Sequence, residues 1–183
     1  MAETGTTVRD ALVKTIPNLR AFAISLTGDH HRANDLVQDT LLKAWANRDK
    51  FEAGTNLKAW LFTILRNTYF SDIRKRRREV QDVDGQAAAQ LVSPPEQNGN
   101  ADLSDFRKAL TRLSPDQREA LLLVGAEGYS YEEAAAISGC AIGTVKSRVN
   151  RARSHLAELL AIRSPEDLGP EMPANAALAR SPR

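Results

Sequence analysis

The chain has 183 residues, of which 42% are hydrophobic and 26% charged, and its formal net charge is only +2. This length fits one domain or two small ones. The single cysteine, Cys140, excludes an intrachain disulfide and a cluster of thiolate metal ligands. No apolar run approaches the ~20 residues that span a bilayer, and the polar, acid-containing N-terminus is not typical of a secretory signal. We therefore expect a cytoplasmic protein without a membrane segment.

Three helices are predicted in the first part of the chain. The first covers roughly residues 8–26 and ends at Gly28. A second and a third follow from apolar residues at the i, i+3, i+4 spacing of amphipathic helices. The inward stripe of the second helix is Ala33, Leu36, Val37, Leu41, Ala44 and Trp45. That of the third helix is Leu57, Leu61, Ile64, Leu65 and Thr68. Between these helices, residues 51–56 have the composition of a turn, with Asn56 as the candidate N-cap.

The composition changes between residues 79 and 103. Acidic residues occur in this segment without any lysine or arginine: Glu79, Asp82, Asp84, Glu96 and Asp102. The segment also contains the turn-forming pairs Pro94-Pro95 and Asn98-Gly99. An acidic segment with so few large apolar residues predicts a flexible acidic linker.

Helical periodicity resumes at Phe106 and continues to about Ile162, and Ser114 followed by Pro115 indicates a helix start inside this region. The last residues, 164–183, hold four prolines and are expected to be disordered. There is no alternating strand pattern, so we predict an all-α fold of two small helical domains. Four segments follow in order: a helical domain over 8–78, the linker over 79–103, a second helical domain over 104–163 and the tail over 164–183.

The most specific local pattern begins at Tyr131 and predicts a helix-turn-helix that ends near Arg153. Ala135 is small at the point where the two helices must touch. Gly139, four residues later, tolerates the left-handed backbone that the turn requires. The second helix would bury an apolar stripe at i, i+4, i+7 and i+11: Val145, Val149, Ala152 and Leu156.

The opposite side of that second helix is cationic and polar. We expect it to bind DNA through Thr144, Lys146, Ser147, Arg148, Arg151 and Arg153. No acid lies between Lys146 and His155, and such a helix can enter the major groove and also hold phosphates. A helical hairpin with a solvated basic face is the alternative, but the small-residue spacing and the one-sided charge coincide, which favours DNA binding. The motif alone does not separate a sigma factor from a response-regulator output domain or a repressor.

Three motifs in the first domain decide between these classes: residues 35–45 (DLVQDTLLKAW), 56–67 (NLKAWLFTILRN) and 72–78 (DIRKRRR). They resemble the conserved second region of sigma factors, and the helix-turn-helix resembles their fourth region. The spacing of the two domains resembles a sigma factor that lacks the middle domain, which is the extracytoplasmic-function class (group IV of the sigma-70 family). The resemblance covers about residues 16–78 and 105–160.

This resemblance implies binding surfaces for both core RNA polymerase and promoter DNA. The helix over residues 35–45 would dock on the clamp helices of the largest subunit of core RNA polymerase through Asp35, Gln38, Asp39, Leu42 and Lys43. The helix after Asn56 would recognise and open the −10 promoter element through Asn67, Ser71, Arg74, Lys75, Arg76, Arg77 and Arg78. The basic helix of the second domain would bind the −35 element, and this domain would also contact the flap of the second-largest subunit. Tyr69 and Phe70 are equally compatible with base stacking and with core packing.

Residues 53–67 together with 76–80 are further similar to the alphaproteobacterial general-stress-response (EcfG-like) group. In that group a small anti-sigma protein sequesters the sigma factor. A phosphorylated response regulator with a sigma-like domain then takes the anti-sigma protein away. The resemblance therefore implies a general stress regulon and an anti-sigma partner.

An enzyme, a metal site and a cofactor are not predicted. His30, His31 and His155 lack a third ligand at metal spacing, and the chain has no Gly-rich phosphate loop and no nucleophile motif. Cys140 is expected to pack rather than react. Two other functions stay open. A stand-alone regulator would bind −35 DNA tightly without polymerase. A module that only titrates an anti-sigma protein would not need the run of cations or the basic helix.

Overall fold

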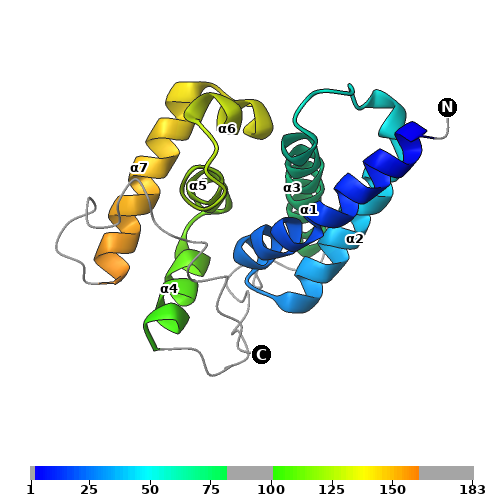
Figure 1. Ribbon diagram of the computed structural model, residues 1–183. Helices are drawn as coiled ribbons and strands as arrows, with labels where there is room; N and C mark the ends of the chain where they lie inside the picture. Colours follow the sequence, from blue (N-terminus) through cyan, green and yellow to red (C-terminus); the bar gives the residue numbers. More distant parts are fainter. Residues whose placement is uncertain (1–2, 82–100, 161–183) are drawn as a thin grey trace. The chain divides into compact units, whose positions relative to one another are not determined.

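The structure is a computed structural model, and it describes residues 3–81 and 101–160. These residues form helices joined by short turns, without a strand among them (Figure 1). The contacts divide the chain into two compact units. Their members are Met1–Ile24 with Asp29–Pro95 for the first unit, and Ser25–Gly28 with Glu96–Arg183 for the second. The predicted all-α class with two helical domains is confirmed.

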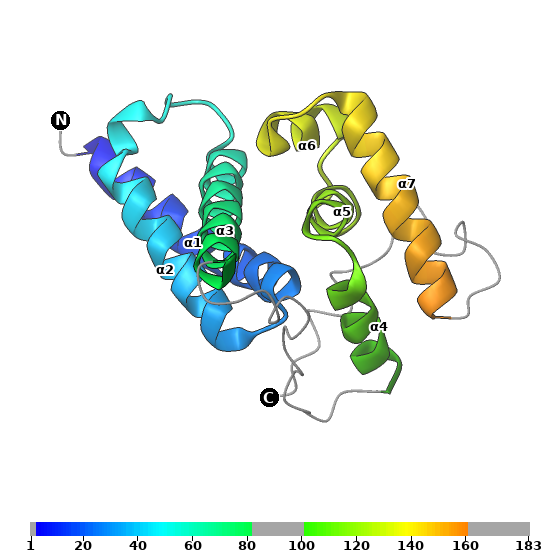
Figure 2. The same ribbon diagram turned by 180° about the vertical axis from the view of Figure 1, so that it is seen from behind.

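The first unit contains α1 (Glu3–Thr27) as far as Ile24, α2 (His30–Ala46), the 3₁₀ turn η1 (Arg48–Lys50) and α3 (Leu57–Gln81). Helices α2 and α3 pack side by side, as the view from behind also shows (Figure 2). The centre of the core consists of large side chains with at most 2% of their surface exposed: Leu19, Phe22, Leu61, Phe62 and Leu65. The rings of Phe22 and Phe62 lie 4.7 Å apart and join α1 to α3.

Local signals mark where the helices of the first unit begin and end. Gly28, with φ of 69°, terminates α1, because only a residue without a Cβ adopts this backbone cheaply. The carboxylate of Asp29 accepts a hydrogen bond from the Arg32 N–H at 2.9 Å and so caps α2. Asn56 does the same for α3, because its side-chain oxygen accepts from the Ala59 N–H at 3.0 Å. The prediction of Asn56 as an N-cap is confirmed.

The second unit contains α4 (Ala101–Arg112), α5 (Pro115–Leu121), the π-helical turn η2 (Leu122–Ala126), α6 (Tyr131–Ser138) and α7 (Ile142–Leu159). Ser114 caps α5, and the Ser114 N–H in turn donates to the side-chain oxygen of Gln117, which completes a capping box. Helix α7 packs mainly against α5 and then against α6. Its predicted inward stripe is confirmed, since the four side chains have 0% of their surface exposed: Val145, Val149, Ala152 and Leu156.

Buried Arg118 joins α4 to α5 in this second unit. Its guanidinium donates to three carbonyl oxygens around the C-terminus of α4, those of Leu110 at 2.7 Å, Thr111 at 2.6 Å and Leu113 at 3.0 Å. The last carbonyls of a helix have no partner inside the helix, so a buried helix end requires such donors. This cation is therefore structural: it fixes α5 to the end of α4, and α7 packs against α5.

Two predictions about the boundaries and the core need revision. Helix α3 continues to Gln81 and α4 begins at Ala101, so helices occupy both ends of the segment predicted as the linker. The rest of that segment and the predicted tail lie outside the described residues. The prediction that Trp45 packs inward is wrong, because 47% of its surface is exposed. At 100° per residue, Trp45 lies about 120° from the centre of the buried stripe of α2. No helix in the described part of the chain is long and apolar enough to cross a membrane.

Candidate nucleic-acid interface

The helix-turn-helix has the predicted geometry. Ala135 is 6% exposed at the contact between its two helices. Gly139 ends α6 with φ of 63°, the left-handed conformation that the turn was expected to need. The Cys140 N–H then donates to the Ala135 carbonyl at 3.1 Å, and α7 starts two residues later. The turn therefore fixes the angle at which α7 leaves α6.

The solvent side of α7 carries most of the predicted DNA-binding residues. Lys146 and Arg151 are exposed, while Thr144, Ser147 and Arg153 are half-buried. Asn150, four residues after Lys146, is also exposed on this side. Asn150 is not among the predicted DNA-binding residues, although its position between Lys146 and Arg151 in a segment without acids is a usable signal. The ammonium group of Lys146 lies 5.6 Å from the centre of the Tyr131 ring and so links the start of α7 to α6.

Arg148 differs from the other cations of α7. Its side chain is only 24% exposed, and its Nη2 lies 2.9 Å from the Asp116 carboxylate on α5. Its Nη1 donates to the Cys140 sulfur at 3.6 Å, in the turn before α7. One guanidinium therefore contacts α5 and the turn while it projects from α7. Arg148 lies at the edge of the DNA-binding side rather than at its centre.

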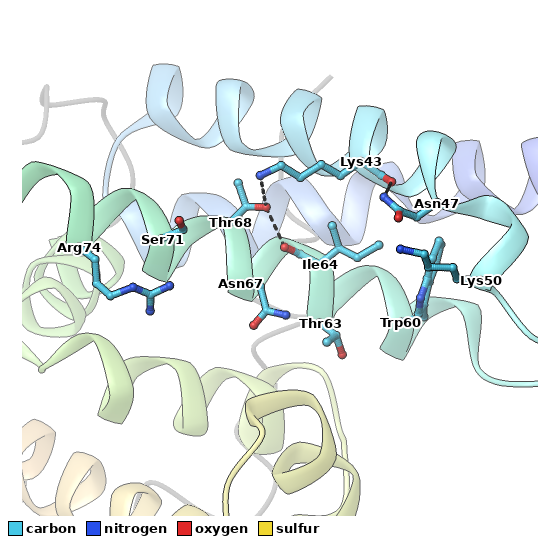
Figure 3. A pocket seen from close by; sticks show the side chains of 10 residues that line it. All are labelled: Lys43, Asn47, Lys50, Trp60, Thr63, Ile64, Asn67, Thr68, Ser71 and Arg74. Atoms are coloured by element: carbon cyan, nitrogen blue, oxygen red, sulfur yellow. Dashed lines mark hydrogen bonds between the residues drawn. The ribbon is translucent and has the colours of Figure 1, made fainter.

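An open groove of about 510 Å³ lies between α2 and α3 (Figure 3). It brings together three residues predicted for the −10 element, Asn67, Ser71 and Arg74, on one side of α3. The remaining wall is formed by Lys43, Asn47, Lys50, Trp60, Thr63, Ile64 and Thr68. The lining combines apolar floor with amide, hydroxyl and cationic groups, which suits a planar polar ligand attached to a phosphate.

Lys43 points into this groove from α2 (Figure 3). Its ammonium group donates to the Thr68 hydroxyl at 3.0 Å. Lys43 is also one of the residues predicted to bind polymerase, and its exposed side chain lies at the border between that face of α2 and the groove. The two neighbouring aromatic residues differ in burial. Tyr69 is 6% exposed and belongs to the core, whereas Phe70 is half-buried, with the Arg66 guanidinium 4.7 Å from its ring centre.

A run of five cations, Arg74–Arg78, follows the groove residues of α3 toward the C-terminus of this helix. All five side chains are exposed. Arg76 pairs with Asp72 at 2.9 Å, and Lys75 approaches Glu79 at 3.9 Å, both as i, i+4 pairs along the helix. Arg74 and Arg78 lie on the same helix face as Asn67 and Ser71, at the spacing i, i+4, i+7 and i+11. The groove and the cations of this face therefore form one continuous surface.

The outward face of α2 is polar with two large apolar side chains. The residues predicted to bind polymerase are all exposed: Asp35, Gln38, Asp39, Leu42 and Lys43. Leu42 exposes 69% of its surface, and Trp45, three residues later, exposes 47% with the Arg48 guanidinium 5.2 Å from its ring centre. Two neighbouring exposed apolar side chains on a polar helix are typical of a protein–protein contact.

In the described residues, one unit holds a helix-turn-helix and the other a basic helix beside a groove, which is the arrangement expected of a transcription factor that recognises promoters. Comparison with family profiles agrees with this class. The profile of sigma-70 region 2 matches residues 12–79, and that of sigma-70 region 4 matches residues 103–156.

Individual relatives give the same result. The ECF RNA polymerase sigma factor EcfG of Rhodopseudomonas palustris is 60% identical over 164 residues, which is 90% of this chain and 91% of that protein. The ECF RNA polymerase sigma factor SigC of Mycobacterium tuberculosis is 36% identical over 146 residues, 79% of this chain and 77% of that protein. The chain therefore belongs to the extracytoplasmic-function (ECF) family of RNA polymerase sigma factors.

A solved structure has the same fold as this chain. The sigma factor RpoE from Bartonella quintana, crystallised in complex with the anti-sigma factor NepR, is 60% identical to this chain. The TM-score is 0.77, and the match covers 86% of this chain and 99% of that chain.

Proposed function

We propose that this protein directs core RNA polymerase to promoters by binding the −10 element with α3 and the −35 element with α7. The observation that carries the proposal is the surface on α3, where the groove residues Asn67, Ser71 and Arg74 continue into the cations up to Arg78. A stand-alone DNA-binding regulator has no need of such a surface outside its helix-turn-helix.

The groove suits an unstacked base of the −10 strand. Its volume of about 510 Å³ lies within the ~300–1,000 Å³ of typical ligand sites. Trp60 and Ile64 offer apolar surface for stacking, and the Asn67 amide can both donate to and accept from a base edge. Holding a base outside the duplex offsets the few kcal/mol that unstacking costs, so such a groove promotes strand opening.

The cations of the C-terminal half of α3 would hold phosphates beside the groove. Exposed i, i+4 pairs such as Arg76–Asp72 are worth less than ~1 kcal/mol, so a phosphate can replace the carboxylate at little cost. Each cation that neutralises a phosphate releases condensed counterions, which makes the contact favourable but dependent on salt. The run Arg74–Arg78 would therefore supply affinity, and the groove would supply the sequence preference.

Helix α7 would read the −35 element in the major groove. Lys146, Ser147 and Arg151 lie on its solvent side, and an arginine can bind guanine through O6 and N7 together. Thr144 and Arg153 are half-buried at the edges of this side and suit phosphate contacts. The second unit would also contact the flap of the second-largest polymerase subunit.

The outward face of α2 would dock on the clamp helices of the largest polymerase subunit. Leu42, with 69% of its surface exposed, supplies apolar contact at the centre of this face, and Asp35, Gln38 and Asp39 surround it with polar groups. A small apolar centre with a polar rim is the usual organisation of a protein interface. Since polymerase works in the cytoplasm, we propose the same location for this protein.

We also propose that a small anti-sigma protein holds the factor inactive and that its regulon belongs to the general stress response. The support is the 60% identity to RpoE, which was crystallised with the anti-sigma factor NepR, and the same identity to EcfG. An inhibitor that covers the outward face of α2 or the groove would block polymerase or promoter binding.

The proposal is tested by reconstituted transcription from a candidate stress promoter. Core polymerase alone should give no specific transcript, and addition of the protein should give one that starts at a single site. Tight binding to −35 DNA without polymerase, together with no stimulated transcript, would instead support the stand-alone regulator. Prior incubation with a NepR-type protein should abolish the transcript.

A further inference from the structure

An acidic residue, Asp116, holds a cation of the recognition helix in the second unit. The Asp116 carboxylate lies 2.9 Å from Nη2 of Arg148. We infer that Asp116 is a positioning residue for promoter binding: through Arg148 it fixes the orientation of α7 on α5, and Arg148 itself does not read bases. This inference rests on the proposed function of α7.

The backbone at the start of α5, where Asp116 lies, is restrained by local contacts. Asp116 follows Ser114 and Pro115, which start α5 with a capping box and a proline in the first turn. Proline restricts its own backbone, and the box satisfies the first amide groups of the helix. The carboxylate is therefore presented from a fixed point, and Arg118 fastens α5 in turn to the carbonyls that end α4.

The position of Arg148 on α7 agrees with a bracing role. Val145, Val149 and Ala152 face the core with 0% exposure. Steps of 100° per residue put Arg148 nearer to this buried stripe than to the middle of the solvent side. Its side chain is 24% exposed, whereas that of Arg151, about one turn later, is exposed to solvent.

The second contact of Arg148 reaches the turn of the motif. Nη1 donates to the Cys140 sulfur at 3.6 Å, so the same guanidinium touches α5 and the residue next to Gly139. Because both terminal nitrogens of the guanidinium already have partners, fewer N–H groups of Arg148 can donate to a base edge. Lys146, Ser147 and Arg151 are then the side chains on the solvent side of α7 that would face bases, in an orientation that the Asp116–Arg148 pair sets.

If Arg148 instead read bases, removing the charge of Asp116 would have the opposite effect on promoter affinity. If Arg148 released Asp116 to bind guanine, the carboxylate would compete with DNA for the guanidinium and would repel phosphates. Removing its charge would then leave promoter affinity unchanged or raise it. If the pair braces α7, removing the charge lowers affinity even though it removes a negative charge from a DNA-binding surface.

The experiment uses the full-length protein with core polymerase and measures affinity for promoters that differ by single base pairs in the −35 element. The variants are Asp116→Asn, Asp116→Glu, Arg148→Ala and the double Asp116→Asn/Arg148→Ala, with Arg151→Ala as the control that tests base reading. We expect Asp116→Asn to lower affinity about fivefold on every promoter, and Asp116→Glu to keep most of it. The double variant should be no weaker than Arg148→Ala alone.

Three results would overturn the inference. They are an unchanged or higher affinity of Asp116→Asn, a changed preference at one base pair in Arg148→Ala, and a fall of more than about 10 °C in the Tm of Asp116→Asn. The last result would mean that the pair holds the fold together, since a surface pair worth under ~1 kcal/mol shifts the Tm of a small domain by no more than ~8 °C. Failure of the proposed function is recognised separately, because Arg151→Ala would then have no effect on any promoter.

Discussion

The ammonium group of Lys43 lies 3.0 Å from the hydroxyl oxygen of Thr68 and donates a hydrogen bond to it. The Thr68 hydroxyl in turn donates to the Ile64 carbonyl at 2.9 Å, so a short chain of hydrogen bonds joins α2 to α3 at the groove. A residue of α2 thereby adds a positive charge to the wall that holds Asn67 and Ser71. The two functions proposed for the first unit, polymerase binding and promoter opening, therefore meet at Lys43.

The position of Lys43 yields a prediction that separates these two functions. Lys43→Met keeps most of the side-chain length but removes the charge and the hydrogen bond to Thr68. We expect the fraction of opened promoters to fall about two- to fivefold, corresponding to ~1 kcal/mol at an exposed charge, while affinity for core polymerase is unchanged. Permanganate reactivity of unpaired thymines measures the first quantity, and fluorescence anisotropy measures the second. Loss of polymerase affinity with normal opening would return Lys43 to the docking surface.

Asn67 is predicted to act in opening rather than in initial binding. Asn67→Ala removes the only side-chain amide that α3 contributes to the groove lining, so a base held there would lose its polar partner. Formation of the closed complex should remain near normal, and permanganate reactivity at −10 should fall by an order of magnitude, as for ~1–2 kcal/mol. Asn34→Ala is the matched control, because Asn34 is an exposed asparagine of α2 that does not line the groove. An equal loss of closed and open complexes would contradict the role.

Much of the fold could be predicted from the sequence because the signals are local. The stripe that ends at Leu156, the cap at Asn56 and the turn at Gly139 depend on residues within four positions of one another. Trp45 was predicted wrongly because an aromatic residue one step after Ala44 was counted as part of the inward stripe. In the structure, Thr40 takes a buried place on that stripe and Trp45 faces outward.

The groove could not be predicted in the same way. Its wall combines Asn47 and Lys50, which precede α3, with Trp60 and Arg74 from within it. Which side chains of two helices face a shared space depends on how the helices are rotated and packed, and periodicity gives only the buried side of each. The contact between Asp116 and Arg148 was hidden for the same reason, since 32 positions separate the residues in the sequence.

The exposed apolar residues of α2 lead to a prediction about polymerase binding. Leu42→Ala and Trp45→Ala should each weaken binding to core polymerase about tenfold, because a central apolar side chain of an interface is worth ~1–2 kcal/mol. Helicity and the free energy of unfolding should hardly change, since 69% and 47% of these side chains are already exposed. Val13→Ala on α1, with 57% of Val13 exposed, is the control that should bind normally. Unfolding of either α2 variant would show that the residue is structural.

Arg151 is predicted to carry base preference at the −35 element. Arg151→Ala should reduce the free energy of binding to the preferred promoter by about 1–3 kcal/mol, with a matching loss of transcription. The loss should be much smaller on promoters that are already changed at the contacted base pair. Competition between such promoters in a single transcription reaction measures this difference directly. Arg107→Ala, which removes an exposed arginine of α4, is the control: it should lower transcription from all promoters equally or not at all. A uniform loss for Arg151→Ala would assign it to phosphate binding instead.

The cap of α2 makes the stability of the first unit sensitive to acid. The hydrogen bond from the Arg32 N–H, at 2.9 Å, holds the pKa of the Asp29 carboxyl below its ordinary value of 3.8. A carboxyl whose pKa is lower in the folded protein stabilises the fold above its unfolded pKa, and this contribution is lost as the pH falls through the folded value. Asp29→Ala should therefore lower the free energy of unfolding at pH 7 by about 0.5–2 kcal/mol, and the difference from wild type should shrink toward pH 3.

Asp29→Asn separates the cap from the charge, because an asparagine oxygen also accepts from the N–H groups of a helix start. This variant should keep most of the stability at pH 7 and should lose less stability than wild type between pH 5 and pH 3. Urea unfolding followed by circular dichroism at each pH measures both quantities. If Asp29→Ala and wild type lose stability in parallel between pH 5 and pH 3, the Asp29 carboxylate does not stabilise α2 through this hydrogen bond.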